Sequence, residues 1–150
     1  MAQTNIESLI DHLRYTSRTR VGLWRFPLAK IGHEAEFAVR FGVEGLDVSA
    51  YMRERLPIGA EFVRLSEQKV LDTLDEIAST HGKSDCVLVY NFDLLLSGVT
   101  SNERKSIWQF LFNGFPNRTR ALLLVIPETA DQLLPSETNI DAWQRDSRLI

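Results

Sequence analysis

Two uninterrupted apolar runs constrain the fold of this chain more than any other feature of its sequence. Cys86 to Tyr90 reads CVLVY, and Ala121 to Ile126 reads ALLLVI. A strand with one face in water alternates apolar and polar residues, whereas a strand buried on both faces of a parallel sheet is apolar throughout. The two runs therefore predict parallel strands that have helices on both sides.

The segments around these runs alternate between helical and extended patterns. Apolar residues at helical spacing predict helices over 5–16, over 28–41, from Ser66 to a stop at 81–82, and from a cap at Ser101 or Asn102 to Gly114. Short helices are expected near 50–56 and 128–134, and short strands at 21–26 and 45–48. This order predicts an α/β fold, a three-layer parallel sheet of about four strands with flanking helices, in one domain spanning 1–150. Residues 135–150 are expected to form a polar tail.

Cysteine and histidine content limits the chemistry. One cysteine cannot form an intramolecular disulfide, and with three scattered histidines it cannot build a structural zinc site. No metal or cofactor is therefore expected. Neither a leader peptide nor an apolar stretch of membrane-spanning length is evident, so the prediction is a cytoplasmic protein that does not enter a membrane.

Charge is distributed unevenly along the chain. The net charge of −3 disfavours a purely electrostatic nucleic-acid binder. The first 30 residues nevertheless carry five bases and two acids. A DNA-contacting accessory domain therefore stays open as an alternative, with four candidate contacts: Arg14, Arg18, Arg20 and Arg25.

At the strand ends, the sequence shows a partial resemblance to a known family. Ligands of parallel α/β sheets bind beyond the carboxyl ends of the strands. The stretch CVLVYNFDLLL at 86–96, followed by NRT at 117–119 and LLLVIP at 122–127, resembles the BrxF-like small P-loop proteins of BREX phage-exclusion operons. The resemblance implies an AAA-like P-loop fold and a role in an anti-phage complex.

The nucleotide-binding motifs of that family are degenerate here. A P-loop needs GxxxxGK[ST], because its glycines let backbone N–H groups reach the phosphates and its lysine neutralises them. After the first predicted strand this chain reads RFPLAKIGH, with no glycine before Lys30 and no hydroxyl after it. The resemblance puts an acidic Mg²⁺ ligand where Tyr90 stands and a second where Asp93 stands. ATP binding is therefore not expected.

Four polar residues are what could remain of a nucleotide site: Lys30, Asn91, Asp93 and Arg118. The alternative for Lys30 is a solvated residue weakly paired with Glu34, and for Asn91 and Asp93 a structural turn. Arg118 could reach a neighbouring subunit or could lie on the solvated rim of a strand.

Three aromatic residues do not fit the predicted core periodicities: Phe110, Phe115 and Trp143. Unburied aromatics in a soluble chain mark partner surfaces. The favoured hypothesis is a non-catalytic binding or assembly subunit that contacts other proteins or a second copy of itself. The competing hypothesis is an ATPase or nucleotide-dependent switch whose phosphate site is unconventional or completed by a partner. For Trp143, docking back on its own domain is the open alternative.

Overall fold

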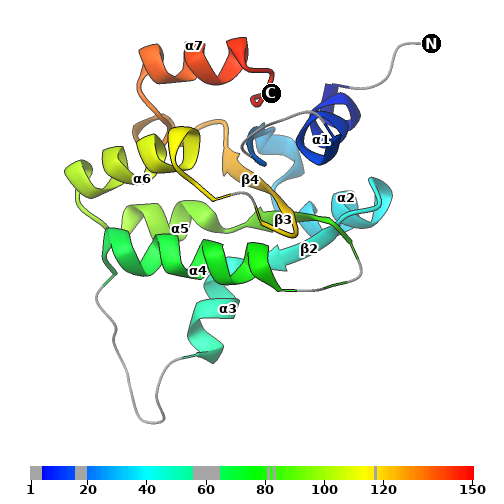
Figure 1. Cartoon of the computed structure of the whole chain (residues 1–150), viewed down its shortest axis with the longest axis horizontal. Coiled ribbons are helices and arrows are strands. Elements are labelled where there is room, and N and C mark those ends of the chain that lie inside the picture. Colours follow the sequence, from blue (N-terminus) through cyan, green and yellow to red (C-terminus); the bar gives the residue numbers. More distant parts are fainter. Residues whose placement is uncertain (1–4, 16–19, 56–64, 81, 83, 117) are drawn as a thin grey trace.

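The chain forms a four-stranded parallel sheet covered by helices (Figure 1). The computed structural model describes residues 5–15, 20–55, 65–80, 82, 84–116 and 118–150. The strands are β1 (Val21–Phe26), β2 (Glu44–Asp47), β3 (Cys86–Tyr90) and β4 (Ala121–Pro127), in the spatial order β1-β4-β3-β2. All three strand pairs are parallel, so the α/β prediction is confirmed.

The two apolar runs lie side by side at the centre of this sheet. Val87 is opposite Leu122 and Val89 is opposite Leu124, as expected for strands buried on both faces. Successive side chains enter different cores, because the side-chain direction alternates along a strand. Leu122 and Leu124 belong to one core, and Leu123 belongs to the other.

Helices supply the outer layers on both faces. The helices are α1 (Asn5–Tyr15), α2 (Glu34–Arg40), α3 (Val48–Glu54), α4 (Glu67–Ser79), α5 (Phe92–Ser97), α6 (Ser101–Asn113) and α7 (Glu137–Arg145). Residues of α1 and α2 share one core, and residues of α3 to α7 share the other. Two short 3₁₀ turns, η1 (Leu28–Lys30) and η2 (Asp131–Leu133), follow β1 and β4. No helix in the described part of the chain is long and apolar enough to cross a bilayer.

The predicted helix over 28–41 is wrong in its first half. Residues 28–30 form the η1 turn, and α2 begins only at Glu34. Gly32 interrupts the helix because its φ of +97° is a left-handed conformation that a helix does not contain. Leu28, Ile31 and Val39 are therefore exposed rather than buried on one helical face.

The predicted polar tail is also wrong, because residues 135–150 contain α7 and a strand-like extension. Residues 148–150 run parallel to β1, with a bridge between Leu23 and Leu149. Arg148 fixes this segment: its buried guanidinium donates to the carbonyls of Val21, Leu111 and Phe112.

Helix caps were predicted with mixed success. Ser66 caps α4 by accepting the Lys69 N–H, as expected. The cap of α6 is Thr100 instead of Ser101 or Asn102, since Thr100 and Glu103 form a reciprocal capping box. The predicted helix at 128–134 is reduced to η2, and α5 was not anticipated.

Candidate functional site

The loop that follows β1 is where the resemblance to P-loop proteins would put a phosphate-binding loop, but carboxylates of the same chain accept hydrogen bonds from two of its backbone N–H groups. The Leu28 N–H donates to Glu128 Oε1 at 3.2 Å, and the Gly32 N–H donates to Glu34 Oε1 at 2.6 Å. Pro27, at the start of the loop, has no N–H to offer. A phosphate group would have to displace two carboxylates to reach these donors and would be repelled by their charge.

Lys30 does not compensate for this negative charge inside the loop. Its Nζ lies 5.0 Å from the centroid of the Phe37 ring, within the range of a cation–π contact. The weak pair with Glu34 that its spacing predicts does not form, because the Glu34 carboxylate turns back to Gly32. Lys30, at the end of η1, therefore contacts Phe37 of α2 and is not directed at the backbone donors of the loop.

Asn91 and Asp93 mark the end of β3, where they begin α5. Asn91 adopts a left-handed conformation with φ of 62°, and its side chain does not cap the helix. Asp93 is half-buried, and its pKa is raised by burial and then by the nearby Glu34 carboxylate. In the described part of the chain Asp93 forms no ion pair, and the backbone hydrogen bonds from Asp93 and Leu94 that lower its pKa are outweighed by burial.

Two further acids lie close to this position. Glu34 is only 9% exposed and, within the described ranges, forms no ion pair. The pKa of the Tyr90 phenol is raised by burial and then by the Asp47 and Glu34 carboxylates. Among the described residues, no group of three or more His, Cys, Asp or Glu is arranged to hold a metal ion. The carboxyl edge of the sheet is thus acidic.

Arg118 is not part of this edge. It precedes β4 and therefore lies at the amino end of the sheet, where its guanidinium binds both carboxylate oxygens of Asp75 at 2.6 and 3.3 Å. Of the four predicted nucleotide-site residues, the fold brings Lys30, Asn91 and Asp93 to one edge and puts Arg118 at the other.

Most of the described basic residues near the start of the chain are bound internally. Arg14 pairs with Asp85 at 2.7 Å, and Arg20 donates to the Leu13, Arg118 and Thr119 carbonyls. Arg18 lies outside the described residues. Arg25 is half-buried and borders open grooves between β1, η2 and α7 that also contain Asp131, Glu137 and Asp141. Arg14, Arg20 and Arg25, the described members of the predicted set, therefore do not form a basic face for DNA.

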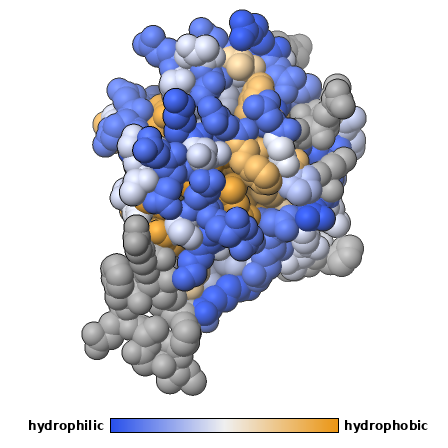
Figure 2. All heavy atoms as spheres, turned by 60° about the vertical axis from the view of Figure 1, so that its left-hand side comes forward, coloured by the Kyte–Doolittle hydropathy of each residue, from blue (hydrophilic) through white to orange (hydrophobic). Residues whose placement is uncertain are grey.

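Apolar side chains are exposed at the same edge of the sheet. Leu28 is 58% exposed, Ile31 is 42% exposed and Leu94 is 51% exposed. The first two follow β1 and the third follows β3, so parallel pairing brings them to the carboxyl end of the sheet, on opposite sides of the intervening strand β4. We call these three residues the carboxyl-edge patch. On the face shown in Figure 2, apolar residues gather in the middle of a mostly hydrophilic surface.

The predicted aromatic surface is largely incorrect. Trp143 is fully buried and Phe115 is buried as well, because α7 and the chain after α6 pack onto the core. Phe110 is 39% exposed, with its ring edge-on to that of Phe115. Of these three aromatic residues, only Phe110 therefore remains a candidate for contact with a partner.

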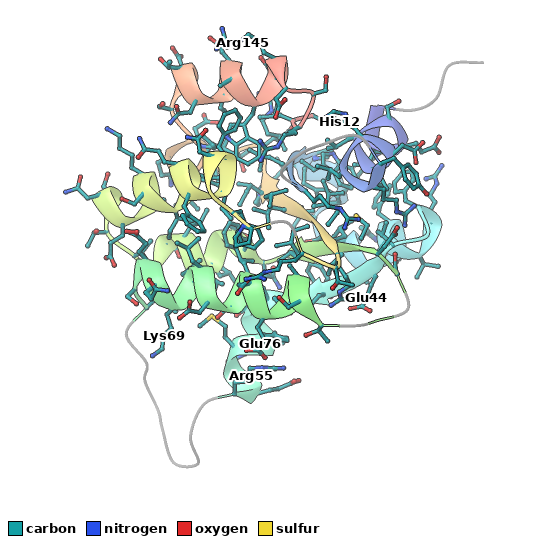
Figure 3. All side chains as sticks on the ribbon, in the orientation of Figure 1. His12, Glu44, Arg55, Lys69, Glu76 and Arg145 are labelled. Carbon is teal, nitrogen blue, oxygen red and sulfur yellow. The ribbon has the colours of Figure 1, made fainter. Side chains whose placement is uncertain are left out.

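A polar cluster joins α3 to α4 away from these residues. The Tyr51 hydroxyl donates to Glu76 Oε1 at 2.5 Å, and Arg55 Nε donates to the same oxygen at 3.0 Å. Figure 3 shows Arg55 and Glu76 pointing toward one another. Burial, followed by the Glu76 carboxylate, raises the pKa of Tyr51 to about 12. A protonated tyrosine that only donates to a paired carboxylate fastens two helices and is a poor proton acceptor.

The carboxyl-edge patch escaped the sequence analysis because Leu28 and Ile31 were assigned to the buried face of a helix. Gly32 was the available signal, because a glycine inside a helical pattern can mark the point where one element ends and another begins. Comparisons with protein-family models, curated proteins and solved structures found no match. The site therefore has to be interpreted from its own chemistry.

Proposed function

We propose that this chain is a non-catalytic, P-loop-like binding or assembly subunit of a prokaryotic multi-protein complex. The observation that carries the proposal is the closure of the loop after β1 by Glu34 and Glu128. The resemblance of its second half to BrxF-like proteins suggests that the complex belongs to anti-phage defence.

The layout of the sheet supports the P-loop-like part of the proposal. β4 lies between β1 and β3, so the loop after β1 and the Asn91–Asp93 turn flank the end of one central strand. A phosphate loop and an acidic Mg²⁺ ligand would have to be arranged in this way to act on one nucleotide. The strand order is compatible with that layout, and the Leu28 and Gly32 N–H groups donate to carboxylates of the chain itself.

The exposed side chains support the binding part. Leu28, Ile31 and Leu94 are exposed after the carboxyl ends of β1 and β3, and exposed apolar side chains favour burial against a partner. An ATPase would instead need a cation directed into the loop, and Lys30 lies over Phe37.

Calorimetric titration with ATP and Mg²⁺ tests the non-catalytic part. We expect no binding with a dissociation constant below about 100 μM, because two carboxylates would have to be displaced. Tighter binding, or ATP hydrolysis above background, would support the nucleotide-dependent switch instead.

Co-expression with the products of the flanking genes tests the assembly part. We expect a partner to copurify with the wild type and to be lost from the Leu28→Ser, Leu94→Ser double variant, whose melting temperature should be unchanged. Val39→Ser is the matched control, because Val39 is exposed and apolar but lies on α2 outside the patch. Retention of the partner by the double variant would remove the patch from the proposal.

A further inference from the structure

We propose that an open groove between α1, β1 and residues 144–150 binds a small organic carboxylate, with the guanidinium of Arg25 holding its carboxylate group. The inference does not depend on the proposed function, because no residue of the carboxyl-edge patch lines this groove.

The position of Arg25 in β1 is unusual for a charged residue. It is the one charged side chain of that strand, VGLWRF. Side chains alternate along a strand, so Arg25 shares a face of the sheet with Val21 and Leu23, which are fully buried in the core. Arg25 itself is half-buried at the end of this apolar row.

The guanidinium of Arg25 forms neither an ion pair nor a hydrogen bond within the described ranges of the chain. Every other described arginine that is at least partly buried binds a carboxylate or a backbone carbonyl: Arg14, Arg20, Arg104, Arg120 and Arg148. A partly buried charge without a partner costs free energy, which an anion beside it would recover. Arg25 is therefore the exception that a bound anion would explain.

The groove beside Arg25 has the size and lining of a small-molecule site. Its volume is about 430 Å³, within the range of such sites. Polar side chains line it next to Arg25, namely Ser8, His12, Gln144 and Ser147, and apolar contact comes from Leu9, Leu149 and Ile150. No described Asp or Glu lines it. Figure 1 shows the C-terminal end of the chain close to α1, as this lining requires.

The chain itself does not neutralise Arg25. Ile150 accepts the Arg25 backbone N–H at 2.8 Å, and no ion pair joins it to the guanidinium. Four acids line two further grooves that also border Arg25, and none of them pairs with it among the described residues: Glu128, Asp131, Glu137 and Asp141. Their charge repels a phosphate dianion more than a singly charged carboxylate. The apolar lining favours a carboxylate that carries an aliphatic body.

An NMR titration tests the inference, with the side-chain Nε–H signal of Arg25 as the reporter. The probe is hexanoate, and its matched compounds are hexanamide, which has the same shape without the charge, and inorganic phosphate. We expect hexanoate to shift the Arg25 signal and to saturate with a dissociation constant of about 1 mM. Hexanamide and phosphate should each bind at least about tenfold more weakly, because one lacks the charge and the other is repelled.

Protein variants locate the carboxylate. Arg25→Gln should weaken hexanoate about tenfold or more, and Arg25→Lys about threefold, since an ammonium keeps the charge but not the two parallel hydrogen bonds. Backbone amide signals of residues that line the groove report binding in these variants. Arg145→Gln is the matched control, because Figure 3 shows Arg145 on the side of α7 that faces away from the sheet, where it is exposed. This control should bind hexanoate as the wild type does.

Three results would overturn the inference. Unchanged affinity in Arg25→Gln, or no saturable binding by the wild type below about 20 mM, would mean that Arg25 does not form an anion site. Equal affinity for hexanoate and hexanamide would make the groove merely apolar. Tighter binding of phosphate than of hexanoate would assign the wrong anion. If Arg25→Gln does not fold, the comparison of Arg25→Lys with the wild type decides, and copurification of a flanking-gene partner tests the proposed function separately.

Discussion

The Glu34 carboxylate accepts the Gly32 backbone N–H at 2.6 Å, which ties the first residue of α2 to the loop after β1. The contact spans two residues and occupies the donor that a left-handed glycine presents at this position. In a phosphate loop such a donor would face the ligand. Here the chain supplies the anion itself.

The first prediction concerns this hydrogen bond between Gly32 and Glu34. Glu34→Ala should lower the free energy of unfolding by about 1–3 kcal/mol, because the Gly32 N–H loses its hydrogen bond to a charged acceptor on a largely buried side chain. Glu36→Ala is the control: Glu36 is exposed and, among the described residues, pairs with His33, so its loss should cost less than about 1 kcal/mol. Urea unfolding followed by circular dichroism measures both.

The same variant tests whether the hydrogen bond between Gly32 and Glu34 alone prevents nucleotide binding. We expect Glu34→Ala to bind ATP no better than the wild type, since Glu128 still occupies the Leu28 N–H and no hydroxyl follows Lys30. ATP binding by the variant would mean that the loop can still bind a nucleotide and that the Glu34 carboxylate prevents this in the wild type.

The second prediction is a pH dependence that originates at Asp93. Burial, then the neighbouring Glu34, raises the pKa of Asp93, so the folded state holds this proton more tightly than the unfolded state. The contribution of Asp93 to stability must then fall as the pH rises from the ordinary aspartate pKa of about 4 through the raised folded value. Asp93→Asn should therefore gain stability relative to the wild type at pH 7 and lose that advantage near pH 3.

Urea unfolding of both proteins at the two pH values measures this difference. An Asp93→Asn variant that is less stable than the wild type by the same amount at both values would show that its backbone hydrogen bonds outweigh the burial of its charge.

The third prediction concerns the sheet. Leu124→Ala should lower the free energy of unfolding by about 2–5 kcal/mol, because Leu124 is fully buried between β1 and β3 and its truncation leaves a cavity. Val39→Ala removes methyl groups from an exposed position and should change stability by less than about 0.5 kcal/mol. A cost below about 1 kcal/mol for Leu124→Ala would contradict the central position of β4.

The strands could be predicted because their signal is local. β3 and β4 contain five and six consecutive apolar residues, a pattern typical of strands that helices cover on both faces. In the structure Val87 of β3 lies opposite Leu122 of β4. The parallel order of these strands then fixed which residues share the carboxyl edge. Lys30, Asn91 and Asp93 follow the first and third strands in the sequence, and the parallel sheet brings them to that edge.

The details of the edge depend on contacts between residues distant in sequence. Glu128 reaches the Leu28 N–H across 100 positions, and no local pattern reports such a bond. The burial of Trp143 likewise depends on α7 docking against Trp108 of α6. A signal for α7 was present, since Ile140 and Trp143 are three residues apart, but it was outweighed by the polar residues between them.

The fourth prediction concerns Cys86. The thiol is fully buried at the start of β3, and burial raises its pKa to about 12. Since the thiolate is the reactive form, a thiol reagent such as Ellman's should modify Cys86 only when the protein unfolds. Labelling should then be faster in Leu124→Ala than in the wild type. Rapid labelling of the wild type without denaturant would mean that β3 opens in the native state.

The last prediction separates the two aromatic residues that the sequence treats alike. Trp143 is fully buried, with its ring 5.3 Å from that of Phe112 and 6.0 Å from that of Trp108, and with the Arg148 guanidinium 4.5 Å from its centroid. Trp143→Ala should therefore cost about 3–5 kcal/mol of unfolding free energy. Trp143→Phe should cost less, because the indole N–H has no hydrogen-bond partner among the described residues and none is lost.

Phe110→Ser should cost less than about 1 kcal/mol, since Phe110 is half-exposed on α6. Urea unfolding, with sedimentation run in parallel, distinguishes the roles. Wild-type stability in Trp143→Ala would show that α7 does not dock on the core, whereas a Phe110→Ser variant that keeps its stability but loses self-association would add α6 to the contact surface.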